Sequence, residues 1–230
     1  MLTLKPKPGT VIADLPTIRC VMTECVPGQQ TALYSYPDSD AVYLFLEGSG
    51  EIVVMDGAQV EQFSAPMQAY IPAGTPYMLK NVGTASLKFV SGVTPNYPSE
   101  EGVSASASEM EPVVMLGTEN GERFPESGKI RGGMLTFPPN IECDYHSHDE
   151  ADEVFLFLSG SGLVTEEGEV AHVGPGDVVV TLAEQKHKIK SFDDPLVIWL
   201  TVTPNLVPSH THYKQLEDGT WERITPREEA

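Results

Sequence analysis

Residues 154–162 read VFLFLSGSG, and residues 42–50, which lie 112 positions earlier, read VYLFLEGSG. A second match follows, because the VTPN of residues 93–96 recurs at residues 202–205. Two matches at a nearly constant offset indicate a domain duplicated over about half of the chain. We therefore predict two tandem domains, residues 1–110 and 111–230, joined by a linker at residues 97–112, where small and polar residues predominate.

The chain is predicted to be all-β. Short runs rich in β-branched and aromatic residues alternate with Gly, Pro, Asp and Asn, which is typical of strands joined by turns. No window of a dozen residues shows a convincing helical period. Such a pattern favours sandwiches or barrels. The expected strands are residues 42–46, 52–55, 69–71, 87–90, 154–158, 163–165, 178–181 and 196–202.

Charge excludes several classes of partner. The 230 residues include 14 Lys and Arg against 33 Asp and Glu, giving a net charge of −19. Such a surface repels nucleic-acid phosphates and anionic lipids. No apolar run is long enough to span a bilayer, and residues 1–16 do not resemble a secretory signal. We therefore expect a cytoplasmic protein that binds neither nucleic acid nor membranes.

All six histidines lie in the second copy, so the two copies should differ in chemistry. His146 and His148 share one face of an extended strand, because alternate side chains point the same way. Glu153 begins the next strand, and His187 follows a later one. Three imidazoles and one carboxylate favour a divalent transition metal: Fe, Mn or Ni, with Zn also possible. The same residues without a metal would form a buried polar cluster that is hard to satisfy with hydrogen bonds.

These residues carry a family resemblance. The pattern His-x-His-x4-Glu-x6-Gly, at His146, His148, Glu153 and Gly160, resembles the first cupin motif. The segment from Gly176 to His187 resembles the second. With the duplication, the whole chain resembles a bicupin, which implies two double-stranded β-helix barrels and one metal per chain, held by the C-terminal barrel. The chain departs from the motifs at Asn140, Leu182 and Glu184, where the family has Gly, Pro and Gly; Glu184 is thus a candidate for an additional carboxylate at the site.

The first copy lacks the ligands. Tyr34, Tyr36 and Ala41 take the places of His146, His148 and Glu153, and Tyr77 takes that of the third histidine. A neutral phenol is a poor ligand for these metals. We therefore predict a metal-free first barrel in which the tyrosines fill the degenerate site, with a functional tyrosine pocket as the less favoured alternative.

Strand parity assigns the neighbouring side chains. If Glu153 points inward, so do Phe155 and Phe157, which are predicted to line a substrate pocket. Residues 154, 156 and 158 then form an apolar outer face that needs a cover, either the other barrel or a second chain in a homodimer.

The other chemistry-bearing residues receive ordinary interpretations. His172 is predicted to lie at the surface. His210 and His212 could form a solvated turn, a flap over the barrel or an adventitious metal site, and we favour the turn. Cys143 is expected to be a small buried or loop thiol, with a redox role as the less favoured alternative, and Lys188 and Lys190 should face solvent.

Three functions fit this reading. The first is a dioxygenase acting on a small organic substrate, because the ligand set leaves positions for substrate and O₂. The second is a redox-neutral decarboxylase, isomerase or lyase that uses the same site. The third is a non-catalytic small-molecule-binding or storage protein.

Overall fold

The computed structural model describes residues 1–55, 59–94 and 111–224. These residues form strands and turns without any helix, which confirms the all-β prediction. Most of the predicted linker, residues 97–110, lies outside the described residues.

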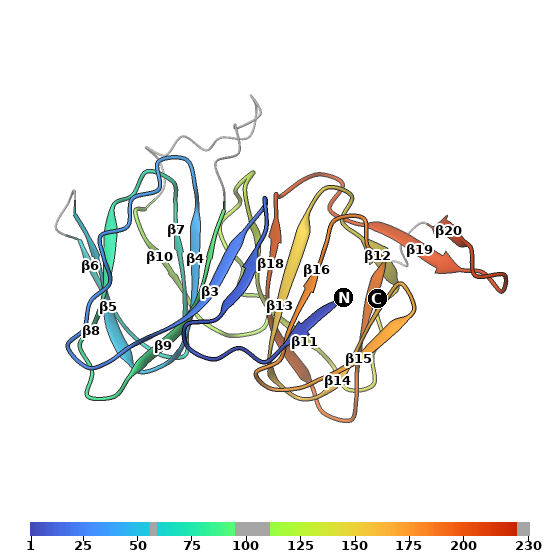
Figure 1. Ribbon diagram of the computed structural model, residues 1–230, viewed down its shortest axis with the longest axis horizontal. Coiled ribbons are helices and arrows are strands. Elements are labelled where there is room, and N and C mark those ends of the chain that lie inside the picture. The colour runs from blue at the N-terminus through green and yellow to red at the C-terminus, as the bar shows by residue number, and fades with distance from the viewer. Residues whose placement is uncertain (56–58, 95–110, 225–230) are drawn as a thin grey trace.

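Four sheets make two barrels that stand side by side (Figure 1). The larger sheet of the first barrel contains, in order, β10 (Val114–Leu116), β7 (Met67–Ile71), β4 (Ala41–Glu47), β9 (Leu87–Val93), β3 (Arg19–Cys25) and β2 (Val11–Asp14). Its smaller sheet contains β6 (Val60–Ser64), β5 (Ser49–Val54) and β8 (Tyr77–Asn81).

The second barrel repeats this plan with one sheet of five strands and one of six. One sheet contains, in order, β1 (Leu2–Leu4), β16 (Val178–Thr181), β13 (Asp152–Ser159), β18 (Leu196–Thr203) and β11 (Arg131–Phe137). The other contains β15 (Glu169–Val173), β14 (Gly162–Glu166), β17 (His187–Ser191), β12 (Tyr145–Ser147), β19 (Thr211–Gln215) and β20 (Trp221–Ile224).

The repeated sequence forms the matching strands β4 and β13. Each strand ends in a register shift against its neighbour, followed by a glycine with positive φ, 90° at Gly48 and 76° at Gly160. A Cβ atom would meet the carbonyl oxygen of Ser86 at 2.6 Å or that of Pro195 at 2.1 Å. Glycine is therefore required at both turns, both for its φ and for the close approach of another backbone.

The two barrels exchange edge strands. β1, at the start of the chain, pairs with β16 of the second barrel, with Leu2 opposite Val180. β10, from the second half of the sequence, pairs with β7 of the first barrel. The division of the chain between residues 110 and 111 borders the undescribed segment and stays a prediction.

The apolar outer face of β13 is covered by the other barrel. Val154 and Leu156 belong to a buried cluster that also contains Val42, Leu44 and Trp199. The predicted need for a cover is therefore met within one chain, and a homodimer stays a prediction. The opposite parity points inward: Phe155 and Phe157 lie in the interior core of the second barrel.

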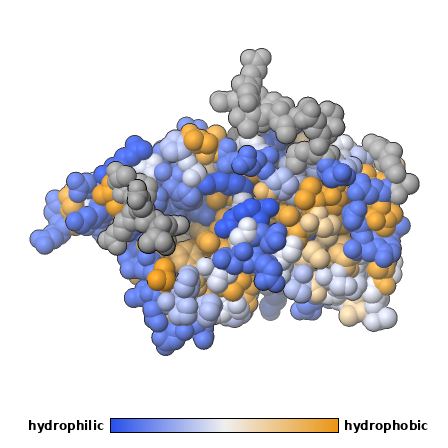
Figure 2. Space-filling view, turned by 180° about the vertical axis from the view of Figure 1, so that it is seen from behind, coloured by the Kyte–Doolittle hydropathy of each residue, from blue (hydrophilic) through white to orange (hydrophobic). Residues whose placement is uncertain are grey.

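The chain after β18 projects as a hairpin of β19 and β20 (Figure 1). The second strand of this hairpin, β20, lies within the acidic C-terminal segment of the sequence. The projecting hairpin shows a mostly hydrophilic surface (Figure 2). Among the described residues, the structure contains no helix with the length and apolar character needed to cross a membrane.

Candidate metal centre

The structure brings together the four predicted ligands. His146 lies on β12, His148 directly follows it, Glu153 lies on β13 and His187 begins β17. One ligand atom from each lies within 4.8 Å of all the others. His148, Glu153 and His187 are buried, and His146 is partly buried. The cluster can therefore hold a metal ion.

The turn before His187 keeps its shape despite its unusual sequence. Glu184 adopts a φ of 66°, close to the 84° of Gly74 at the equivalent turn of the first barrel. Its backbone N–H donates to the carbonyl oxygen of His148 at 2.9 Å, which ties this turn to the ligand strand. The Glu184 side chain is exposed and outside the four-residue cluster, so the structure does not bring it into the site.

Backbone carbonyls fix the orientation of the three imidazoles. The Nδ1 atoms of His146, His148 and His187 lie 3.0, 2.6 and 3.1 Å from the carbonyl oxygens of Asp144, Ser209 and Gln185, respectively. A carbonyl oxygen can only accept, so each Nδ1 carries the hydrogen and each Nε2 is left for a ligand. Metal-binding histidines in proteins are commonly held in this way.

The carboxylate of Glu153 joins two of the rings. Its Oε2 atom lies 2.8 Å from Nε2 of His148 and 3.1 Å from Nε2 of His187. Burial raises the pKa of Glu153, but the two histidines outweigh burial and hold it well below its usual value. Burial lowers the pKa of His187, yet the bond to Glu153 leaves it raised. In the metal-free protein, the buried pair of Glu153 and His187 therefore holds protons at the position where a metal cation would bind.

His146 has the opposite tendency. Burial and the neighbouring His187 hold the pKa of His146 well below its usual value. Its imidazole is therefore neutral near pH 7, which is the form that binds metals.

Sequence reasoning missed Arg131, which supports His148 from behind. Its Nη2 donates to the carbonyl oxygen of Ser209 at 2.8 Å and lies 3.0 Å from Nδ1 of His148. Its Nε is buried without a hydrogen-bond partner among the described residues. The internal repeat of the sequence could have pointed to Arg131, because Arg19 occupies the equivalent position. Arg19 pairs with Val93 in the first barrel as Arg131 pairs with Val202 in the second.

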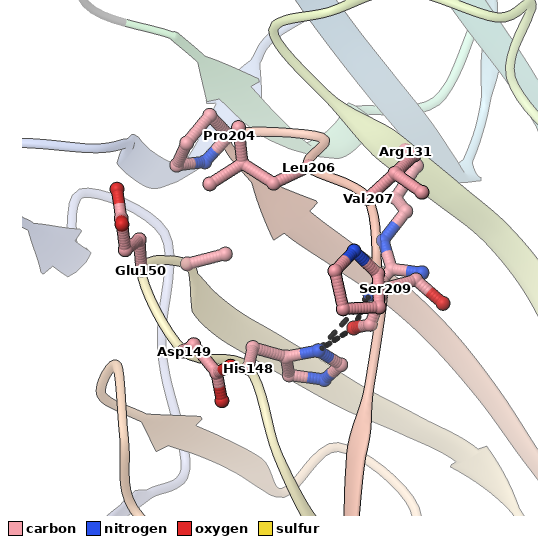
Figure 3. A pocket seen from close by; sticks show the side chains of 10 residues that line it. Arg131, His148, Asp149, Glu150, Pro204, Leu206, Val207 and Ser209 are labelled. Carbon is pink, nitrogen blue, oxygen red and sulfur yellow. Dashed lines mark hydrogen bonds between the residues drawn. The ribbon is translucent and has the colours of Figure 1, made fainter.

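A pocket of about 130 Å³ lies beside His148. Arg131 and Ser209 meet His148 on one side of it, and Pro204 and Leu206 lie along another (Figure 3). Phe155 and Phe157 are inside the barrel, as parity predicted, but neither lines this pocket. Phe155 instead packs its ring against His187, with 5.8 Å between the ring centroids.

Two further polar side chains were also missed. Thr181 lies directly opposite Glu153 on β16, and Glu166 lies directly opposite His187 on β14. Both are 1% exposed. The Thr181 hydroxyl has no hydrogen-bond partner in the described residues, and Glu166 Oε1 lies 2.7 Å from the α-amino nitrogen of Met1.

The solvated turn favoured for His210 and His212 is wrong for His212 and holds for the exposed position of His210. His212 lies on β19, where it pairs with His146. His210 is exposed, but its ring centroid lies 4.6 Å from that of His148 and 5.0 Å from that of His146. Both histidines therefore belong to the surroundings of the candidate centre. In the sequence, the second His-x-His pattern could have indicated that these histidines lie near the centre.

Aromatic side chains occupy the corresponding part of the first barrel. Tyr77 is 1% exposed, and its hydroxyl lies 2.6 Å from that of Tyr43. Tyr34 and Tyr36 stack at 5.9 Å between ring centroids, and Ala41 is buried beside them in the same core. Burial raises the pKa values of Tyr34, Tyr36 and Tyr77, so all three phenols are neutral near pH 7. This arrangement is consistent with tyrosines that fill the degenerate site.

The remaining predictions concern side chains outside the cluster. His172 is exposed at the surface, as predicted, and so is Lys190. Lys188 is only partly exposed and pairs with Glu142 at 2.7 Å. Cys143 is a free thiol whose pKa burial raises to about 11, which agrees with an unreactive role.

A family model described as Cupin domain matches residues 133–203. Salicylate 1,2-dioxygenase from Pseudaminobacter salicylatoxidans superposes with a TM-score of 0.66 at 12% identity, over 82% of this chain and 71% of that one. An oxalate decarboxylase gives 0.60 at 14% identity, over 87% and 74% of the two chains. A Cupin 2 conserved barrel domain protein from Leptotrichia buccalis gives 0.62 at 14% identity, over 88% and 96%. No curated protein matches, and these identities show a shared fold alone.

Proposed function

We propose that the chain belongs to the cupin superfamily and that its second barrel is the active site of a metal-dependent enzyme for a small organic substrate. The observation that carries this proposal is the convergence of His146, His148, Glu153 and His187. We assign one divalent transition ion per chain to them, with Fe, Mn or Ni preferred and Zn possible.

The residues present suit such an ion. Three Nε2 atoms and one carboxylate oxygen converge, and each imidazole is already held through Nδ1 by a backbone carbonyl. Four protein ligands leave positions open in the octahedral geometry of Fe, Mn or Ni. When bound, the ion would polarise substrate oxygen atoms and support redox chemistry with O₂.

The chain's own groups perform the remaining tasks. Glu153 supplies a buried negative charge that offsets part of the ion's charge. Phe155 and the apolar core beneath it exclude water from that side of the centre. The pocket beside His148 shares that one residue with the four-residue cluster, and Leu206 and Pro204 give it an apolar wall that would suit an apolar portion of a substrate.

We propose a dioxygenase-type reaction, in which both atoms of O₂ enter an aromatic, phenolic or diketone substrate. This choice rests on a ligand set that can accept a bidentate substrate and O₂ together. Redox-neutral decarboxylation, isomerisation or lyase chemistry uses the same ligands and is the principal alternative. A non-catalytic small-molecule-binding or storage role is the third.

The test begins with elemental analysis of tag-free protein. Metal-replete protein is then mixed with a panel of small carboxylic acids, phenols and diketones in an oxygen electrode, and products are followed by mass spectrometry. We expect O₂ uptake with at least one compound and its loss in His148→Ala, whereas the exposed His172→Ala should retain it.

The other outcomes separate the alternatives. Product formation without O₂ uptake would replace the dioxygenase with the redox-neutral reaction. Saturable binding of a panel compound without turnover would favour the non-catalytic role. Purified protein with metal in both barrels, or with none that the second barrel retains, would overturn the assignment of the centre.

A cytoplasmic location and a homodimer remain proposals. The first rests on the acidic composition. The second was motivated by the apolar strands, but the outer face of β13 is covered by the other barrel, so it has no support from that face.

A further inference from the structure

The second His-x-His pattern lies beside the first in the folded chain. We propose that His210 and His212 form a second binding site for a divalent transition metal, at the mouth of the second barrel. This site is separate from the centre formed by His146, His148, Glu153 and His187.

The pairing of β12 with β19 creates the arrangement. His146 pairs with His212, and Ser147 pairs with Thr211. His148 and His210 lie directly beyond this pairing, with 4.6 Å between their ring centroids. Directly opposed residues in an antiparallel pair place their side chains on the same face. Two His-x-His patterns thus give a two-by-two array of imidazoles on one surface.

The spacing of the outer pair resembles that of the inner ligands. The ring centroids of His210 and His212 lie 5.8 Å apart. The three inner pairs, among His146, His148 and His187, have separations of 5.5, 4.3 and 5.7 Å. Small rotamer adjustments would therefore allow the outer imidazoles to share an ion as the inner ones can.

Among the described residues, the ring of His210 makes one hydrogen bond and the buried Nδ1 of His212 makes none. His210 uses Nδ1 in a 2.8 Å contact with the hydroxyl of Ser209, which leaves Nε2 for a ligand. The Nδ1 atom of His212 is buried without a hydrogen-bond partner in the described part of the chain. A buried ring nitrogen without a partner costs free energy, so packing alone does not account for histidine at position 212.

The inner ligands cannot serve both ions. Nδ1 of His146 and that of His148 are held by backbone carbonyls, and their Nε2 atoms belong to the inner cluster. The outer ion would therefore have two protein ligands completed by water. Imidazole nitrogens select Zn²⁺, Ni²⁺, Co²⁺ or Cu²⁺ over Mg²⁺ and Ca²⁺, which prefer oxygen ligands. Two ligands should bind more weakly than four.

The experiment counts ions without any substrate. Tag-free, metal-depleted protein is titrated with Zn²⁺ and with Ni²⁺ by isothermal calorimetry, and bound metal is measured after equilibrium dialysis. We expect about two equivalents for the wild type, one tight and one weaker. The double variant His210→Ala/His212→Ala should keep the tight equivalent and lose the weak one.

Two variants make the result specific. His146→Ala/Glu153→Ala/His187→Ala, which leaves His148 as the one remaining inner ligand, should lose the tight equivalent and keep the weak one, and His172→Ala should keep both. Titration with Cu²⁺ followed by electron paramagnetic resonance should report two coordinated nitrogens at the outer site of this triple variant. These readings are independent of catalysis, so a failure of the proposed reaction leaves them unaffected.

Binding of a single equivalent by the wild type, with every ion tested, would overturn the second site. So would a weak equivalent that survives in the His210→Ala/His212→Ala variant, because the ion would then bind elsewhere. Loss of both equivalents in that folded variant would also overturn it, since the outer histidines would then belong to a single centre.

Discussion

The two barrels share a backbone plan and differ in one inward-facing layer. In this layer the first barrel carries tyrosines and aliphatic side chains, and the second carries histidines, carboxylates and a threonine. The corresponding pairs are Tyr34 and His146, Tyr36 and His148, Ala41 and Glu153, Val54 and Glu166, Ile71 and Thr181, and Tyr77 and His187. A whole layer of the barrel can therefore change its chemistry while its strands remain in place.

Buried groups outside that layer are shared. Asp40 and Asp152 accept the backbone N–H groups of Ala73 and Ala183 at 3.0 and 2.9 Å. Each also accepts a hydroxyl from the other half of the sequence: Ser127 donates to Asp40, and Thr17 donates to Asp152. These carboxylates support the fold, so their retention in both barrels contrasts with the loss of Glu153 from the first.

The contrast between the barrels is tested most directly by placing a residue of the first barrel at the equivalent position of the second. His187→Tyr should lower metal affinity at least about 100-fold, since it removes a ligand and places a neutral phenol in the cluster. Bound metal measured by inductively coupled plasma mass spectrometry after equilibrium dialysis checks this. Tyr77→Phe, at the equivalent position, should leave metal content unchanged. Retention of metal in folded His187→Tyr would show that the four-residue cluster is not the centre.

In the first barrel, substitution of Tyr77 should change the free energy of unfolding. Tyr77→Phe leaves the hydroxyl of Tyr43 buried without its partner, which should cost about 1–3 kcal/mol in the free energy of unfolding. The double variant Tyr43→Phe/Tyr77→Phe removes both hydroxyls and should be more stable than Tyr77→Phe alone. Urea unfolding measures both, and a single variant as stable as the wild type would refute the contribution of this hydroxyl pair.

The paired arginines provide a sharper comparison. Arg131→Gln should weaken metal binding about 10-fold, because the carbonyl that orients His148 loses a charged donor. Arg19→Gln, the matched change in the first barrel, should have no such effect. The absorption spectrum of the Co²⁺-substituted protein would report a disturbed ligand geometry. Equal effects of the two substitutions would exclude the positioning role.

The smallest expected effect concerns pH in the metal-free protein. The pKa of His187 is raised by Glu153, so the pair stabilises the fold below the ordinary imidazole pKa of 6.5. This contribution is lost as the pH rises through the higher folded-state pKa. At alkaline pH the neighbouring His146 and His210, whose pKa values burial lowers, are uncharged in both the folded and the unfolded protein, so they do not oppose this loss. In that range the melting temperature of the metal-free protein should therefore fall by about 2–4 °C as the pH rises. Added metal should abolish the decrease, and a melting temperature that rises instead would contradict this account.

The sequence contained enough information for the fold and the inner ligands. Repeated strands with fixed glycines revealed the duplication, and alternation placed Glu153 inside and Leu156 outside. The sequence could not identify the groups that support the ligands, because Arg131 acts through the carbonyl of Ser209, which is far away in sequence. His212 was misjudged because the pairing of β12 with β19 follows from tertiary structure, and local composition there resembles a turn.

The exchange of β1 and β10 makes each half of the chain a structural complement of the other. A fragment comprising only the histidine-bearing half would leave the edge of β16 open and the outer surface of β13 bare. Such an edge invites pairing with other molecules and precipitation. The tyrosine-filled first barrel is therefore needed to cover the second barrel, even though it lacks the metal ligands itself.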